Sequence, residues 1–187
     1  METQSDFRNS ILRLALGTSL LLLIPLIAMQ FSEEVNWTLS DFIFAGTLLF
    51  GTGFMYKIIT RNSSETVYRI AIGFSLFTGL CLIWVNLAVG IIGNENNAIN
   101  ILYFGIIAVG LIGALYVRFK THGMMYVMFG MAVTQALIGG FAITLGRSFT
   151  EGIPIIEILG VNSFFISLFI IAGLLFRYAI KEHAELE

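Results

Sequence analysis

The chain has 187 residues, of which 57% are hydrophobic and only 12% are charged, and its formal net charge is −2. Soluble domains carry roughly 25% charged residues, and a soluble chain of this size can bury only about 60–70% of its surface. The composition therefore excludes an ordinary soluble domain. The single cysteine, Cys81, excludes an intramolecular disulfide framework and a cysteine-based metal cluster. We expect a lipid bilayer around the protein and no nucleic-acid partner.

Six apolar runs follow one another along the chain, each near the roughly 20 residues that cross about 30 Å of hydrocarbon as a helix. Their expected bounds are 11–31, 38–59, 67–92, 98–117, 124–145 and 155–176, and a charged tail occupies 177–187. The runs are continuous, whereas the strands of an outer-membrane barrel alternate. The sequence thus predicts an all-α fold, a single domain in which six transmembrane helices form a bundle.

The first run has a second interpretation, a cleaved signal peptide. It is long for the apolar region of such a peptide, and no small-residue cleavage site follows it. We therefore predict a membrane span that the mature protein keeps. The second run opens with Thr38-Leu-Ser-Asp41. Either Thr38 or Ser40 suits the N-cap position, and Asp41 lies where a helix N-terminus favours a negative charge.

The third run carries a stripe of mostly small residues, at alternating spacings of three and four. On a helix, one face would hold Ala71, Ser75, Gly79, Leu82, Asn86, Gly90 and Gly93. Such a face lets neighbouring membrane helices approach closely. The fifth run shows a second small-residue face at four-residue spacing, with Ala132, Ala136 and Gly140.

Basic residues orient the six spans. Nine of the ten fall on one side of the predicted bundle, Arg8, Arg13, Lys57, Arg61, Arg69, Arg118, Lys120, Arg177 and Lys181, and only Arg147 falls on the other. This bias predicts that both termini are cytoplasmic. Five of these residues surround two inner loops and are candidates for anionic lipid head groups: Lys57, Arg61, Arg69, Arg118 and Lys120. The alternative is that they only determine topology.

Polar residues gather in the outer half of the predicted membrane region. The candidates are Asn86, Gln135, Asn162, Asp41, Glu157 and the neighbouring Trp84. Polar side chains inside a membrane usually face the bundle interior or a wet cavity. One hypothesis is a polar pocket that opens to the outer side. The alternative is hydrogen bonding between helices, which only stabilises their packing.

The loop after the third run is rich in amides and holds one carboxylate. Asn94, Glu95 and Asn97 offer oxygen ligands in a tight segment, as a hard cation such as Ca²⁺ requires. A single carboxylate is few for calcium, and EF-hand spacing is absent. Asparagine and glycine also favour turns for conformational reasons alone. Turn formation is the favoured interpretation and a calcium site is the alternative.

Catalytic motifs are missing from the sequence. His122 and His183 both lie outside the predicted spans, and there is no HExxH, G-x-S-x-G or P-loop. No base stands beside a nucleophile in a recognisable arrangement. We therefore predict no catalytic residues and no cofactor, and the balance is against an enzyme.

The segment Trp84-Val-Asn-Leu-Ala-Val-Gly-Ile-Ile-Gly-Asn-Glu-Asn-Asn97, followed by Ile101-Leu-Tyr-Phe-Gly105, resembles a family of small bacterial integral membrane proteins. That family pairs a W-x-N-x-A-V-G-x-I-G segment with an acidic-amide loop. The resemblance covers spans three to five and implies a bacterial cytoplasmic membrane, but no activity. This chain has Asn97 or Ala98 where the family pattern has a proline.

Three functions are compatible with these patterns. The first is binding or permeation of a small polar solute or cation through the outer polar residues. The second is a non-catalytic scaffold or subunit, whose small-residue faces bind partner helices from a second copy or from another membrane protein. The third is an enzyme that acts on lipids.

Overall fold

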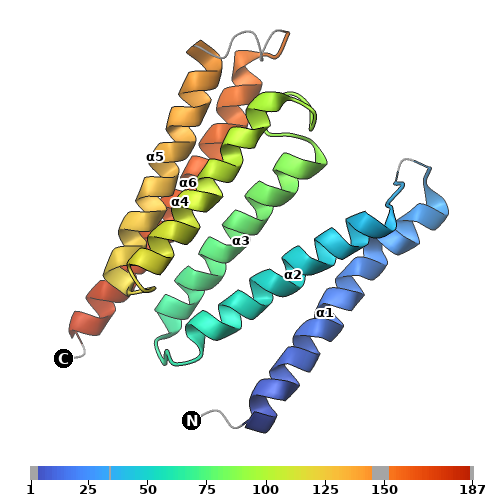
Figure 1. The fold of residues 1–187 in the computed structure, drawn as a ribbon. Coiled ribbons are helices and arrows are strands. Elements are labelled where there is room, and N and C mark those ends of the chain that lie inside the picture. The colour runs from blue at the N-terminus through green and yellow to red at the C-terminus, as the bar shows by residue number, and fades with distance from the viewer. Residues whose placement is uncertain (1–3, 34, 145–151, 186–187) are drawn as a thin grey trace. The chain divides into compact units, whose positions relative to one another are not determined.

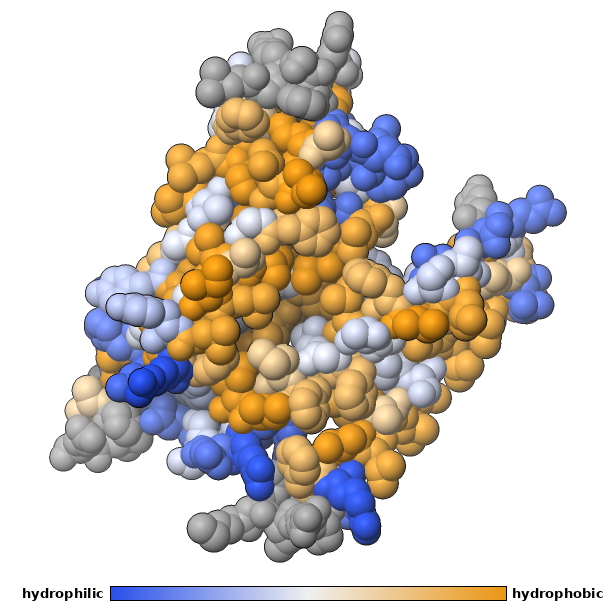
Figure 2. Space-filling view, viewed as in Figure 1, coloured by the Kyte–Doolittle hydropathy of each residue, from blue (hydrophilic) through white to orange (hydrophobic). Residues whose placement is uncertain are grey.

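The computed structural model describes residues 4–33, 35–144 and 152–185. Within these residues the chain is helical and contains no strand, and six helices are long and apolar enough to cross a membrane. This confirms the all-α prediction. Contacts within the chain divide it into two compact units, Met1–Asn62 and Ser63–Glu187 (Figure 1). Figure 2 shows hydrophobic residues over much of the helix surface, as expected of a protein whose solvent is lipid.

The first unit is a hairpin of two helices, α1 (Gln4–Phe31) and α2 (Leu39–Thr60). Two glycines of α2 allow close packing: a Cβ atom at Gly53 would overlap Leu14, and one at Gly46 would come within 3.3 Å of Leu22. Thr38 is the N-cap of α2, as one of the two sequence alternatives proposed.

The second unit contains the remaining helices. They are α3 (Thr66–Ala88), the 3₁₀ turn η1 (Ala98–Ile101), α4 (Leu102–Tyr116), α5 (Thr121–Thr144) and α6 (Ile155–Glu185). Helix α6 packs along α5 and also contacts α3, while α4 packs against α5 and α3. Large side chains fill the space between these helices, among them the fully buried Tyr103, Phe165, Phe169 and Phe176.

Several helix ends differ from the prediction: α1 begins at Gln4 rather than residue 11, α5 begins at Thr121 rather than residue 124, and two C-terminal ends are shifted. Helix α3 was expected to reach residue 92 but ends at Ala88, because Gly90 adopts a φ of +80° that no helix continues. Gly90 and Gly93 therefore lie beyond the helix and do not belong to the small-residue stripe. Of its other members, Ala71, Leu82 and Asn86 are buried and Ser75 and Gly79 are half-buried. At the other end of the unit, α6 does not stop at residue 176 but continues through Glu185.

The small-residue face expected on α5 is only partly buried. Ala132 lies in the core, whereas Ala136 and Gly140 are exposed. The face of α5 that packs inward instead carries Gln135 and Gly139.

Candidate functional site

Three polar side chains meet in the core of the second unit, one from each of α4, α5 and α6. The Tyr103 hydroxyl and the Gln135 Nε2 both donate to Oδ1 of Asn162, each at 3.1 Å. Nδ2 of Asn162 donates to the Ile158 carbonyl one turn earlier in α6, at 2.8 Å. We call Tyr103, Gln135 and Asn162 the amide cluster. Its members are between 0% and 4% exposed, so the cluster is closed to solvent.

The partners of the amide cluster determine which way its amides point. Carbonyl oxygens accept only, so Asn162 must turn its NH₂ group toward Ile158 and its oxygen toward Tyr103 and Gln135. Gln135 must then present its NH₂ group to Asn162, and its Oε1 faces elsewhere. That Oε1 is buried and has no hydrogen-bond donor among the described residues. A buried acceptor without a donor lowers the free energy of unfolding by roughly 1–3 kcal/mol.

A glycine makes room for this arrangement. A Cβ atom at Gly139 would lie 2.9 Å from Cγ of Asn162. Helices α5 and α6 are therefore held close at the level of the cluster, and a side chain at position 139 would displace Asn162 from its two donors.

A second buried centre lies at the end of α3. Nδ2 of Asn86 donates to the backbone carbonyl of Asn100, at 3.1 Å. Because that carbonyl only accepts, the Oδ1 of Asn86 is directed away from it, and this oxygen too is buried without a donor among the described residues. The second unit therefore holds two amide oxygens in the same unsatisfied condition.

Both centres belong to the same end of the second unit. Figure 1 shows the C-termini of α3 and α5 and the N-termini of α4 and α6 at this end. Asn86 precedes the end of α3 by two residues, and Tyr103 is the second residue of α4. Gln135 lies nine residues before the end of α5, which at 1.5 Å per residue is about 14 Å.

Asn100 organises the loop between α3 and α4. Its Oδ1 accepts from the Ile92 amide at 2.9 Å, and its Nδ2 donates to the carbonyls of Asn94 at 2.8 Å and Ile92 at 3.3 Å. Gly90 must lack a side chain here, since a Cβ atom would overlap the Asn94 carbonyl. One buried side chain thus satisfies three backbone groups of the loop.

The predicted cation ligands serve the same loop. Oδ1 of Asn94 accepts from the Asn96 amide at 3.0 Å, and Oδ1 of Asn97 accepts from the Ile99 amide at 3.2 Å. Glu95 is exposed and accepts from the side chain of Asn96. Among the described residues, no three His, Cys, Asp or Glu side chains are grouped so that they could hold a metal ion. The favoured interpretation, turn formation, accounts for these contacts, and the calcium site stays a prediction.

The structure brings two of the six predicted pocket residues together, Gln135 and Asn162. Asn86 is buried in the second centre, Trp84 is half-buried, and Glu157 is exposed in the first turn of α6.

Asp41, the remaining candidate, belongs to the other unit. Its Oδ2 accepts from both the amide and the hydroxyl of Thr38, each at 2.7 Å. Thr38 and Asp41 form a capping box at the start of α2, and this role accounts for the carboxylate at position 41.

The predicted head-group residues occupy different surroundings. Arg61 lies over the ring of Phe7, 5.1 Å from its centre, and Lys57 lines a groove between α1 and α2. Arg69 is exposed on α3. Arg118 and Lys120 lie together at the turn between α4 and α5.

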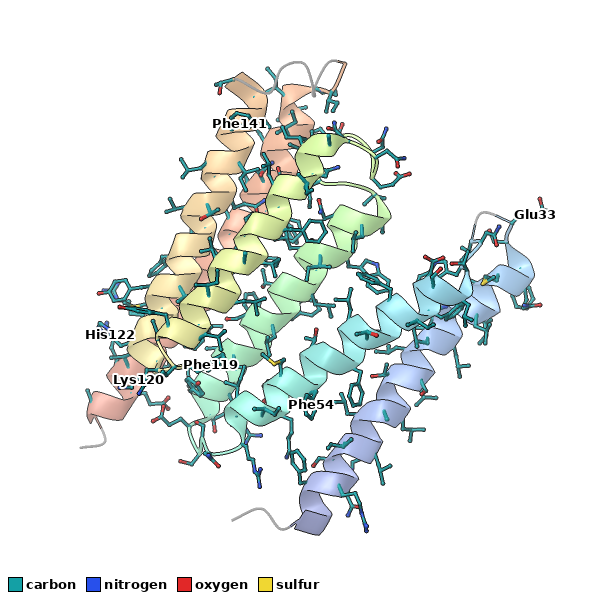
Figure 3. The ribbon with its side chains drawn as sticks, in the orientation of Figure 1. Glu33, Phe54, Phe119, Lys120, His122 and Phe141 are labelled. Atoms are coloured by element: carbon teal, nitrogen blue, oxygen red, sulfur yellow. The ribbon has the colours of Figure 1, made fainter. Side chains whose placement is uncertain are left out.

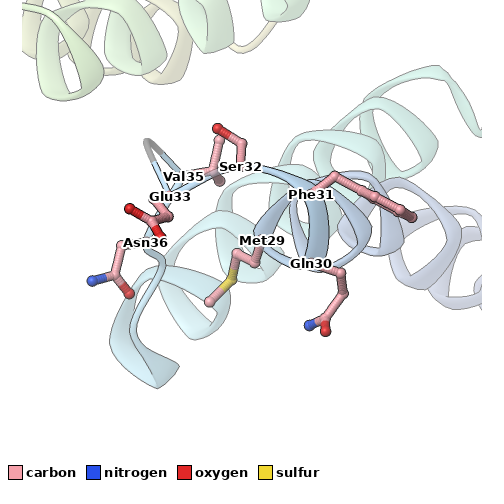
Figure 4. A pocket seen from close by; sticks show the side chains of 7 residues that line it. All are labelled: Met29, Gln30, Phe31, Ser32, Glu33, Val35 and Asn36. Carbon is pink, nitrogen blue, oxygen red and sulfur yellow. The ribbon is translucent and has the colours of Figure 1, made fainter.

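Another hollow lies at the turn of the first unit, as Figure 4 shows. Its lining comes entirely from the end of α1 and the residues that follow: Met29, Gln30, Phe31, Ser32, Glu33, Val35 and Asn36. Among the described residues of this lining, Glu33 alone carries a charge.

Sequence reasoning missed Tyr103. The other five tyrosines, Tyr56, Tyr68, Tyr116, Tyr126 and Tyr178, all fall near the predicted inner ends of their spans, where such rings are common. Tyr103 lies at the opposite end of its span, and a buried hydroxyl needs a partner. Its position away from the other tyrosines was the signal that could have added it to the candidate site.

Comparison of the chain with models of protein families, with curated proteins and with solved structures finds no match.

Proposed function

We propose that this multi-spanning membrane protein binds a small monovalent cation or a small solute rich in hydrogen-bond donors at the amide cluster. The observation that carries the proposal is the buried Oε1 of Gln135, whose direction is set by Asn162 and which has no donor among the described residues. The Oδ1 of Asn86, in the second centre at the same end of the unit, is a separate buried acceptor in the same condition. A ligand that supplies a positive charge or a hydrogen-bond donor would satisfy the oxygen of Gln135.

The chemistry of the cluster restricts the ligand. Amide and phenol groups are neutral, and the amide cluster contains no carboxylate. Divalent cations such as Ca²⁺ are usually bound with carboxylates, so they fit less well than Na⁺, K⁺, an ammonium group or a hydroxyl-bearing solute. The same proposal includes a bacterial cytoplasmic membrane, both termini inside and entry of the ligand from the outer side. The distribution of basic residues supports this orientation of the termini.

The test is the thermal stability of the purified full-length protein in detergent, with Na⁺, K⁺, NH₄⁺, Mg²⁺, Ca²⁺ and a panel of small polar solutes. A ligand at about 100 times its dissociation constant should add roughly 2.7 kcal/mol to the free energy of unfolding. Gln135→Leu should abolish this gain, because it removes the unsatisfied oxygen and keeps a side chain of similar size.

The matched control is Thr134→Val, the neighbouring residue on the same helix. The Thr134 hydroxyl donates to the Gly130 carbonyl within α5 and takes no part in the cluster. Its variant should keep the full gain from the ligand. If no ligand in the panel stabilises the wild type, or if the gain survives in Gln135→Leu, the binding site is not at the amide cluster.

One observation favours the alternative function of a scaffold or subunit. Ala136 and Gly140 lie exposed one turn apart on α5, and a Cβ atom at Gly140 would meet nothing within 4 Å. Small residues on an exposed face allow another membrane helix to approach. Under this alternative, a second membrane protein or a second copy should co-purify with the wild type and be lost from Gly140→Leu.

A further inference from the structure

The turn between α4 and α5 forms a basic hollow at the end of two membrane spans. A space of about 550 Å³ is lined by Tyr116, Val117, Arg118, Lys120, His122 and Gly123. Figure 3 shows Phe119, Lys120 and His122 at this turn. We propose that this space, the basic turn pocket, binds the phosphate of an anionic phospholipid. The proposal is independent of the amide cluster.

Two positive side chains of the basic turn pocket are available to an anion. Arg118 and Lys120 are both exposed, and neither has a carboxylate partner among the described residues. A guanidinium binds phosphate oxygens through two parallel hydrogen bonds, and an ammonium adds a compact point charge. The pair therefore provides both the geometry and the charge that a phosphate monoanion requires.

The backbone holds these side chains in an uncommon conformation. Arg118 and Phe119 have φ values of 53° and 56°, a left-handed region that side-chain-bearing residues rarely adopt. The Phe119 amide donates to the Ala114 carbonyl at 3.0 Å, and the Tyr68 hydroxyl donates to the Phe119 carbonyl at 2.7 Å. Such conformations cluster at functional sites, where the surrounding structure enforces them. Here α3 contributes a tyrosine that secures the turn.

Backbone amides add to the positive character of the pocket. Helix α5 begins at Thr121, and the amides in its first turn have no acceptor within the helix. This helix start lies at the same turn as Arg118 and Lys120, and a helix N-terminus favours a negatively charged group. The ring of His122, which lines the pocket, packs edge-on against Tyr126, with ring centres 5.2 Å apart.

The surroundings indicate that the phosphate belongs to a lipid. On α4, directly before the pocket, Ile112, Leu115 and Tyr116 are 68%, 65% and 88% exposed. Apolar side chains with an adjoining tyrosine are typical of the boundary between acyl chains and head groups. A phosphate bound at Arg118 would have its acyl chains beside this apolar surface.

The test measures the binding of phosphatidylglycerol, phosphatidylcholine and inorganic phosphate to the purified full-length protein in detergent. Each basic residue near an anionic lipid contributes about five-fold in affinity. The double variant Arg118→Gln/Lys120→Gln should therefore bind phosphatidylglycerol roughly 25-fold more weakly than the wild type. Lys181→Gln, which removes an exposed charge on α6 outside the pocket, should bind it as the wild type does.

A second variant separates binding from folding. Arg118→Gly removes the guanidinium but relieves the left-handed backbone, since glycine adopts positive φ without penalty. It should melt at or above the temperature of the wild type and bind phosphatidylglycerol about five-fold more weakly. Unchanged affinity in both pocket variants would overturn the proposal. Equal binding of phosphatidylcholine would overturn the anionic preference, and equally tight binding of inorganic phosphate would overturn the lipid assignment.

Discussion

Asn162 is the residue through which α4, α5 and α6 are joined by side-chain hydrogen bonds. Its single Oδ1 receives both Tyr103 and Gln135, while its NH₂ group is held by its own helix. Gln135, in contrast, makes one hydrogen bond and leaves one oxygen unsatisfied. Replacement of Asn162 should therefore lower stability more than replacement of Gln135, although the two side chains are buried to a similar extent.

The variant Asn162→Leu should lower the free energy of unfolding by about 2–3 kcal/mol, because it leaves two buried donors without an acceptor. Gln135→Leu should stay within about 1 kcal/mol of the wild type, since it loses one membrane hydrogen bond of about 0.6 kcal/mol and also removes an unsatisfied oxygen. Chemical unfolding in detergent, without added ligand, measures both. Equal losses in the two variants would show that Asn162 has no special position in the cluster.

At the residue scale, the amides were predictable and their contacts were not. Gln135 and Asn162 stand out because an amide in an apolar run must find a partner in the protein. Their pairing depends on how far α5 and α6 are displaced along each other and on the space that Gly139 leaves. Neither quantity is encoded in the hydropathy of the two runs.

The loop between α3 and α4 shows how one element is terminated and the next begun. The apolar run continues through Ile91 and Ile92, which are only 2% and 0% exposed, although the helix has already ended at Ala88. Hydropathy therefore extended the predicted span by four residues, because a buried loop is as apolar as a helix. The positive φ values of Gly90 and Gly93 mark the true end, but glycine is also common within membrane helices.

The variant Asn100→Asp should destabilise this loop by about 2–4 kcal/mol. Aspartate cannot donate to the carbonyls of Ile92 and Asn94, and its charge would be buried beside them. Hydrogen exchange at the Ile92 amide and the free energy of unfolding measure the effect. The control is Asn96→Asp, an exposed position in the same loop, which should change stability by less than about 0.5 kcal/mol. A loss no larger than that of the control would contradict the role of Asn100.

At the scale of the whole molecule, the number of spans followed from the sequence because about 20 apolar residues are needed for each crossing. All six predicted runs correspond to helices long and apolar enough to span a membrane. The orientation of the chain rests on its basic residues alone. Arg147, the one basic residue expected on the outer side, lies outside the described residues.

Cysteine labelling in intact cells tests this orientation within the second unit. Cys81 is first replaced by alanine, so that a new cysteine is the only thiol of the chain. In that background Ser63→Cys, which lies between Arg61 and Arg69, and His122→Cys should be protected from a membrane-impermeant reagent until the cells are opened. Asn96→Cys, in the acidic-amide loop, should react in intact cells, because loops poor in lysine and arginine are the ones that are translocated. Reaction of His122→Cys in intact cells would reverse the orientation, and the basic turn pocket would then face the outer leaflet.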